Sequence, residues 1–223
     1  MRVDNDCPIS PAKSGIRARF GFGRRARATK RTSYGRRPTV AGRILSNAGV
    51  VRGATVCLSQ RSALHGSEER TIAVRTTGPE GGIRQRLPVG PSRIIYLTYW
   101  RGPESVVTRS VRLHVKPKVS LRVKPRGALH RGARPRYLVH LRGPYHAHRL
   151  VRFQAKAPAG RWFDLPGRHG TARTTRRGVA RSRMPRLRVS TSYKLRFRAV
   201  VPKQPGYPYA RGTSTIRKRL VRK

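Results

Sequence analysis

The sequence predicts an all-β protein built from two tandem antiparallel β-sandwich domains. Apolar and basic residues alternate with a period of two through residues 31–115 and again through 119–221, and the pattern breaks at Lys116–Lys118. The 17 prolines and 22 glycines of the 223 residues favour short strands and tight turns over helices. Two copies of about 100 residues match the usual size of a domain.

In the first half we expect seven strands, separated by turns about every eight to twelve residues. The first strand is almost entirely basic, as expected of a sheet edge whose charge blocks further pairing. Residues 1–25 show no clear period and are expected to form a flexible N-terminal segment, so the predicted domains span 26–116 and 119–223. The expected strands cover 26–34, 37–45, 52–61, 69–76, 83–87, 93–101 and 105–115.

The second half repeats this plan. Its clearest strand is Tyr193–Val201, in which alternate apolar residues share one face. The last strand is expected over 216–221, with Ile216 and Leu220 as its apolar positions. Residues 170–188 form the weakest part, because their few apolar residues are scattered among arginines.

The charge balance restricts the partners. The chain has 53 basic and 7 acidic residues, a net charge of +46. Any polyanion gains from counterion release where arginine meets phosphate, sulfate or carboxylate, so the expected partners are acidic wall polymers, polysaccharide and, nonspecifically, nucleic acid. A dedicated nucleic-acid reader would concentrate its charge on one face, whereas here arginine is spread along the whole chain.

Two basic clusters stand out, Arg217–Arg219 and a longer run near the N-terminus. Both could contact phosphates nonspecifically, and the alternatives are a solvated terminus and a charged edge strand. The candidate polyanion contacts are those of the longer run, Arg24, Arg25, Arg27, Lys30 and Arg31.

A second candidate site is aromatic. Tyr207 and Tyr209 flank a proline in a turn close to Arg211, and exposed aromatics beside arginine can stack on sugars or bases. Trp162 completes this candidate ligand-binding set. The alternative is that the tyrosines cap the end of the sandwich and Trp162 covers its core.

No residue set indicates catalysis, a metal or a cofactor. Glu68 and Glu69 are adjacent, so a strand would point them to opposite faces. Asp164 and His169 could serve a catalytic triad, but no Gly-x-Ser-x-Gly elbow is present. The segment His146–His148 would place two imidazoles on one face if extended, yet no cysteine or carboxylate lies near in sequence to complete a metal site.

Cysteine usage and targeting signals leave the compartment open. Cys7 and Cys57 form a disulfide if the chain is exported, and otherwise Cys57 is a small core residue. The sequence contains no stretch long enough for a transmembrane helix and no signal-peptide apolar run. We expect an extracellular or cell-surface location if an export signal is encoded upstream of the first codon, and a cytoplasmic one otherwise.

A series of short motifs covers most of 31–221 and comprises Gly35–Ile44, Gly53–Val56, Thr77–Gly90, Leu150–Ala155, Gly160–Trp162, Tyr193–Ala199 and Gly206–Tyr209. These motifs resemble the Ig-like, carboxypeptidase-regulatory-like (transthyretin-type) sandwiches of secreted actinobacterial proteins. The chain departs from that family's pattern at Gly78 and Thr175, where an acidic turn residue is usual, and at 179–183, where an apolar strand is usual.

The resemblance implies a non-catalytic, extracellular or wall-associated structural or interaction module, and some relatives of this sandwich bind carbohydrate. Together with the charge, it favours a module that binds carbohydrate or acidic polymer through an arginine-rich surface. The alternative function is a basic, cytoplasmic nucleic-acid-binding protein.

Overall fold

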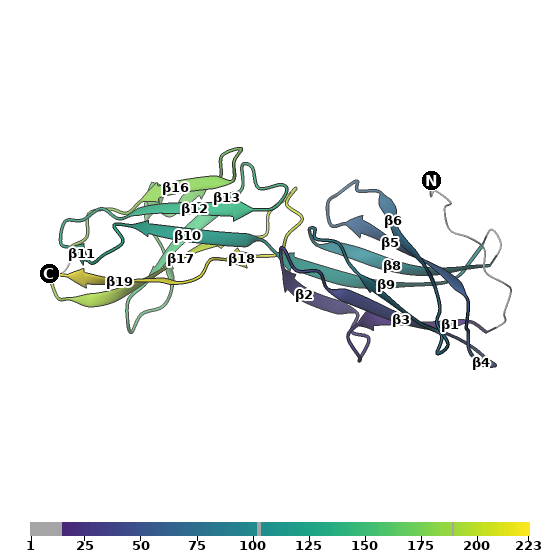
Figure 1. The fold of residues 1–223 in the computed structure, drawn as a ribbon. Coiled ribbons are helices and arrows are strands. Elements are labelled where there is room, and N and C mark those ends of the chain that lie inside the picture. The colour runs from purple at the N-terminus through teal and green to yellow at the C-terminus, as the bar shows by residue number, and fades with distance from the viewer. Residues whose placement is uncertain (1–14, 102–103, 189) are drawn as a thin grey trace. The chain divides into compact units, whose positions relative to one another are not determined.

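The computed structural model describes residues 15–101, 104–188 and 190–223 (Figure 1). The chain forms two compact units, Met1–Val115 and Lys116–Lys223. Strands dominate both, and Gly167–His169 forms one turn of 3₁₀ helix, η1. Within the described ranges, no helix has the length and apolar character needed to cross a membrane.

Unit 1 consists of two sheets. In the first, β3 lies at the centre and pairs with β1, β4 and β7; in the second the order is β2-β9-β8-β5-β6. The first sheet contains β1 (Arg17–Phe22), β3 (Thr39–Ser46), β4 (Gly49–Val50) and β7 (Gly82–Arg86). The second contains β2 (Thr29–Ser33), β5 (Thr55–Ser62), β6 (Glu69–Thr76), β8 (Arg93–Arg101) and β9 (Glu104–Lys116).

The two sheets of unit 1 pack face to face as the alternation predicts. Val40 and Ile44 of β3 and Leu97 of β8 are fully buried. A methyl group on Gly42 would lie 3.3 Å from the Leu97 Cδ1 atom, which shows how closely β3 approaches the opposite sheet. All seven predicted strands are present, and β2 lies at the edge of its sheet as predicted.

Unit 2 also has two sheets. The smaller sheet has the order β10-β12-β16, with β10 (Lys118–Lys124), β12 (Arg136–Arg142) and β16 (Val179–Arg183). In the larger sheet β13 and β17 are central, and β11 pairs with β19 in parallel. Its strands are β11 (Leu129–His130), β13 (Leu150–Lys156), β14 (Phe163–Asp164), β15 (Thr171–Arg173), β17 (Tyr193–Val201), β18 (Gly212–Thr213) and β19 (Arg217–Arg222).

An aromatic cluster joins the two sheets of unit 2. Tyr137 of β12 packs against Phe153 of β13 and Phe197 of β17, with both ring-centroid distances 5.6 Å. All three rings are at most 2% exposed. Because inward and outward residues alternate along each strand, the same strands leave their cations on the outer face.

Two sequence expectations need correction. The segment 1–25 is not flexible throughout, because β1 pairs with β3 over Arg17–Phe22 and buries Phe20 and Phe22. The last strand buries Val221, whereas Ile216 and Leu220 are 49% and 38% exposed, because β19 pairs with β17 in a register that turns Val221 inward. The weak region 170–188 contributes β15 and β16, whose backbones pair with β13 and β12. Residues 1–14 lie outside the described ranges.

Cys57 lies in β5, is 3% exposed and is disulfide-bonded. The other cysteine of the sequence, Cys7, lies outside the described residues. The pairing of Cys7 with Cys57 therefore stays a prediction.

Tyr137 makes unit 2 sensitive to alkali. The Tyr137 hydroxyl donates a hydrogen bond to the Met184 Sδ atom at 3.2 Å. Burial raises the pKa of this hydroxyl above its ordinary value near 10. The folded state then keeps a proton that the unfolded state loses, so this contribution to stability is complete below pH ~10 and declines as pH rises further.

We expect the free energy of unfolding to fall by up to about 1.4 kcal/mol per pH unit above pH ~10 on account of this proton. Tyr137→Phe should remove that part of the slope, as measured by urea unfolding between pH 8 and pH 11. Equal slopes in the two proteins would contradict the assignment.

Candidate functional site

The β1–β2 turn (residues 23–28) is fixed by its own backbone. The Phe22 amide donates to the Arg27 carbonyl at 3.0 Å, and the Arg27 amide donates to the Phe22 carbonyl at 3.1 Å. Gly23 and Ala26 both adopt positive φ, 70° and 47°. A Cβ on Gly21 would collide with the Ala26 carbonyl carbon, so glycine is required for the turn to fold back onto β1. The tip of the turn is therefore held in place against the sheet.

Cations gather on this turn and on the start of β2. Lys30 is half-buried, with its ammonium 5.8 Å from the centroid of the Phe22 ring, and the arginines around it are exposed. They line a groove of about 740 Å³, and the structure thereby brings together every predicted polyanion contact: Arg24, Arg25, Arg27, Lys30 and Arg31.

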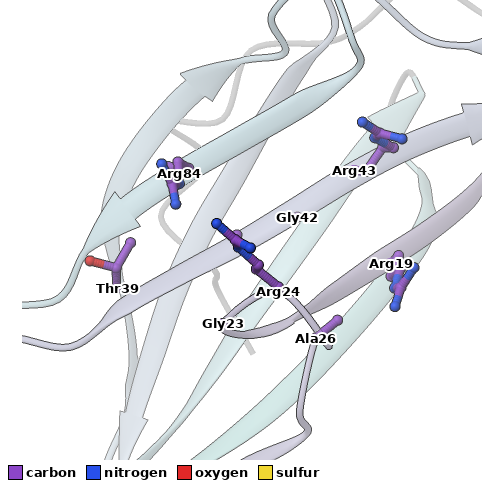
Figure 2. A pocket seen from close by; sticks show the side chains of 9 residues that line it. Arg19, Gly23, Arg24, Ala26, Thr39, Gly42, Arg43 and Arg84 are labelled. Carbon is purple, nitrogen blue, oxygen red and sulfur yellow. The ribbon is translucent and has the colours of Figure 1, made fainter.

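A second groove of about 370 Å³ lies beside the turn on the outer face of the β1-β3-β7 sheet (Figure 2). Ala41 and Gly42 of β3 lie in its lining, and the small side chain of Ala41 leaves a hollow there. Its arginines come from the turn and from three strands, as Figure 2 shows: Arg24, Arg19 of β1, Arg43 of β3 and Arg84 of β7. Arg24 lines both grooves.

The electrostatics of this surface favour an anion. Arg19 and Arg43 are direct neighbours across β1 and β3, and like charges in that position destabilise a sheet. Glu80 offsets part of this through an ion pair with Arg43 at 3.0 Å. Over the described residues the structure has only one other ion pair, between Arg152 and Asp164 at 3.7 Å. A bound phosphate, sulfate or carboxylate would supply the missing counter-charge.

Sequence reasoning missed the strand members of the second groove. Arg19, Arg43 and Arg84 are far apart in sequence. Arg43 and Arg84 look like ordinary residues of basic strands, and Arg19 lies in the segment expected to be flexible. A weak signal was available for Arg43 and Arg84, because they adjoin Ile44 and Ile83 in the expected strands. Only the register of β1, β3 and β7 shows that the three side chains share one hollow.

A second polar and aromatic cluster lies on unit 2 around Trp162. The Arg198 guanidinium lies 4.1 Å from the Trp162 ring centroid and donates to the Gln154 Oε1 atom at 2.7 Å. Gln154 in turn donates to the Asp164 Oδ1 atom at 2.8 Å. Burial lowers the pKa of Arg198, the nearby Arg211 lowers it further, and Asp164 opposes both effects. The cluster therefore includes Trp162 and places Arg211 nearby, two of the four predicted ligand contacts.

Tyr207 and Tyr209 are buried, so the prediction that they are exposed aromatics is wrong. They are 5% and 2% exposed, and their ring centroids lie 5.0 Å apart. The Arg149 guanidinium covers Tyr207 at 5.0 Å from the ring centroid. Burial is the largest cause that raises the pKa of Tyr207, and the neighbouring Tyr209 raises it further, while Arg149 lowers it. The rings pack onto the protein because the turn at Gly206 folds them back, so they are closed to a stacking ligand in this structure.

The histidine pair does not adopt the geometry that a metal site would need. Residues 143–149 form a loop in which Tyr145 and His148 have positive φ, so His146 and His148 do not lie on an extended strand. The His146 Nδ1 and Nε2 atoms lie 2.5 and 3.0 Å from the carbonyl oxygens of Gly143 and Arg176. Over the described ranges, no three residues among His, Cys, Asp and Glu are grouped as a metal would require.

Three of the acidic residues have structural partners. Glu69 accepts a hydrogen bond from the Ser59 hydroxyl, Glu80 pairs with Arg43, and Asp164 accepts from Gln154. The absence of catalysis stays a prediction, because these contacts do not test activity.

The fold and these surfaces define a class: an all-β protein of two units, each with two packed sheets, whose outer faces are strongly basic. No protein-family model and no curated protein matches the chain. Two solved structures of a marsupial T cell receptor are similar to it at 13% and 12% identity. They cover 86% and 92% of this chain and 70% and 72% of their own, with TM-scores of 0.36 and 0.35. These scores are low, so the fold assignment depends on the sheet pairing described above.

Proposed function

We propose that this chain is a non-catalytic β-sandwich module that binds acidic polymers through its basic surfaces, and first through the β1–β2 turn. The observation that carries the proposal is the convergence of cations from the turn and four strands on two adjoining grooves. Seven acidic residues cannot neutralise 53 basic ones, so most of these cations depend on external anions. Releasing the counterions that surround a polyanion then favours binding.

An acidic polymer suits the charge distribution better than a specific nucleic-acid target. Cations lie on the turn and strands of unit 1 and on both sheets of unit 2, for example Arg136 and Arg196. A sequence reader would present one element to base edges, whereas a dispersed surface suits any chain of closely spaced anions. We place the module outside the cytoplasm, because the disulfide-bonded Cys57 suits an oxidising compartment.

The test is a salt titration of binding to heparin, polyglutamate and duplex DNA by fluorescence anisotropy. We expect the variant R24Q/R25Q/R27Q to bind each polymer about ten- to a hundredfold more weakly at 0.1 M salt, because three ion contacts are lost. The slope of log affinity against log salt should fall by roughly 2 to 3 for the same reason.

The matched control is R37Q/R52Q/R70Q, which removes the same charge from exposed positions that line neither groove. It should retain most of the affinity. Equal losses in the two variants would overturn the turn as a site and leave only general charge attraction. Duplex DNA bound far more tightly than heparin at physiological salt would favour the nucleic-acid function instead.

A further inference from the structure

Three strands of the larger sheet of unit 2 place cations directly opposite one another. Lys156 of β13 pairs in register with Arg196 of β17, which pairs with Lys218 of β19. Directly opposed side chains in a sheet lie about 5 Å apart, and like charges there are destabilising. Over the described residues, none of these three cations forms an ion pair. The row therefore presents three adjacent positive charges to solvent.

The neighbouring row is different, because its charges are matched. Asp164, Gln154 and Arg198 form a continuous hydrogen-bonded ladder across β14, β13 and β17. The Asp164 side chain remains 44% exposed. Its Oδ1 atom accepts from Gln154, and its Oδ2 atom lies 3.7 Å from the Arg152 Nη1 atom. An ionised carboxylate only accepts hydrogen bonds, so its remaining lone pairs are open to donors from solvent or a ligand.

Trp162 lies at the end of these rows. It immediately precedes β14, and the alternation of a strand places it on the same face as Asp164. Its contact with Arg198 confirms that placement. The indole is half-buried and the Arg198 guanidinium covers one face of its ring. The part of the indole that stays exposed therefore lies next to hydrogen-bonding groups and three cations.

We propose that this surface, the saccharide face (Lys156, Arg196, Lys218, Gln154, Asp164 and Trp162), binds an acidic polysaccharide. One sugar ring packs against Trp162, its hydroxyls donate to Asp164, and a sulfate or carboxylate of the polymer binds the cation row. The proposal deepens the proposed polyanion function and rests on it, because it names the polymer class for one surface.

Asp164 favours a saccharide over a nucleic acid. Its carboxylate repels a phosphate, but it accepts hydrogen bonds from sugar hydroxyls. A single-stranded nucleic acid would also stack on Trp162, yet its phosphates would approach the carboxylate. The cation row and the row that contains Asp164 are two residues apart along β13 and β17, which suits a ligand that carries hydroxyls and acid groups at different positions.

The test is isothermal titration of the full chain with three probes: a heparin-derived oligosaccharide, inorganic polyphosphate of matched charge, and oligothymidylate. Trp162→Ala should weaken oligosaccharide binding about tenfold, as the loss of one ring contact does, and leave polyphosphate unchanged. Asp164→Asn should weaken the oligosaccharide but strengthen polyphosphate, because repulsion is removed. K156Q/R196Q/K218Q should weaken both.

Trp162→Phe keeps a ring and should recover part of the oligosaccharide affinity, which separates ring contact from loss of folding. R168Q/R176Q/R177Q is the charge-matched control from exposed positions of unit 2 and should bind like the parent. If Trp162→Ala changes no probe while R24Q/R25Q/R27Q weakens all of them, the saccharide face is overturned and the polyanion function stands. If Trp162→Ala weakens oligothymidylate as much as the oligosaccharide, a nucleic-acid surface replaces it. If the parent binds no probe, the proposed function itself fails.

Discussion

Phe197→Ala is expected to lower the free energy of unfolding of unit 2 by about 3 to 5 kcal/mol. Phe197 is fully buried and packs its ring against Tyr137 of the opposite sheet. Removing it takes away both the burial of the ring and the contact that joins the sheets, and leaves a cavity that the strands cannot fully close. Urea unfolding followed by circular dichroism measures the change.

The same strand carries Arg196 and Arg198 on its outer face, so the substitution should also loosen the saccharide face. Hydrogen exchange of the β17 amides should accelerate in Phe197→Ala. Phe163→Ala is the control, because Phe163 is 46% exposed and its truncation should cost less than about 1 kcal/mol. Similar losses in the two variants would contradict a core centred on Phe197.

Reduction of the disulfide is expected to destabilise unit 1 by about 4 kcal/mol, if Cys57 pairs with Cys7. Such a link closes a loop of about fifty residues. Breaking it raises the conformational entropy of the unfolded chain, and this gain sets the size of the expected destabilisation. Cys57 is buried in β5 between Val74 of β6 and Thr98 of β8 across the sheet, so the link would attach the N-terminal segment to the middle of a sheet.

Cys7→Ser is the cleaner variant, because it removes the link and leaves the buried Cys57 side chain in place. Its unfolding midpoint should match that of the reduced parent, and dithiothreitol should have no further effect on it. Peptide mapping under non-reducing conditions identifies the pair directly. Unchanged stability in both the reduced parent and Cys7→Ser would contradict a stabilising link between these cysteines.

The alkaline prediction and the two stability predictions concern different parts of the chain. Tyr137 and Phe197 report on the core of unit 2, whereas Cys57 reports on unit 1. Measured together, they show whether a loss of polymer binding in any variant follows from the substituted side chain or from unfolding of its unit.

The chain's own sequence determined most of the strands and most of their inward faces. Alternation places Leu121, Val139 and Phe197 inside, and the structure buries all three completely. The sequence also grouped the five cations of the turn and of the start of β2 into one candidate site, because they lie within eight consecutive residues. These features are local, since side-chain alternation and turn residues act over a few positions along the chain.

Only the tertiary structure decided which distant residues meet. The register of β1, β3 and β7 assembled Arg19, Arg43 and Arg84, and that of β13, β17 and β19 aligned Lys156, Arg196 and Lys218. Tertiary packing also buried Tyr207 and Tyr209, and turned Val221 inward in place of Leu220. The physical reason is that a period of two gives each strand two faces, but the partner and the register are set by contacts between strands far apart in sequence.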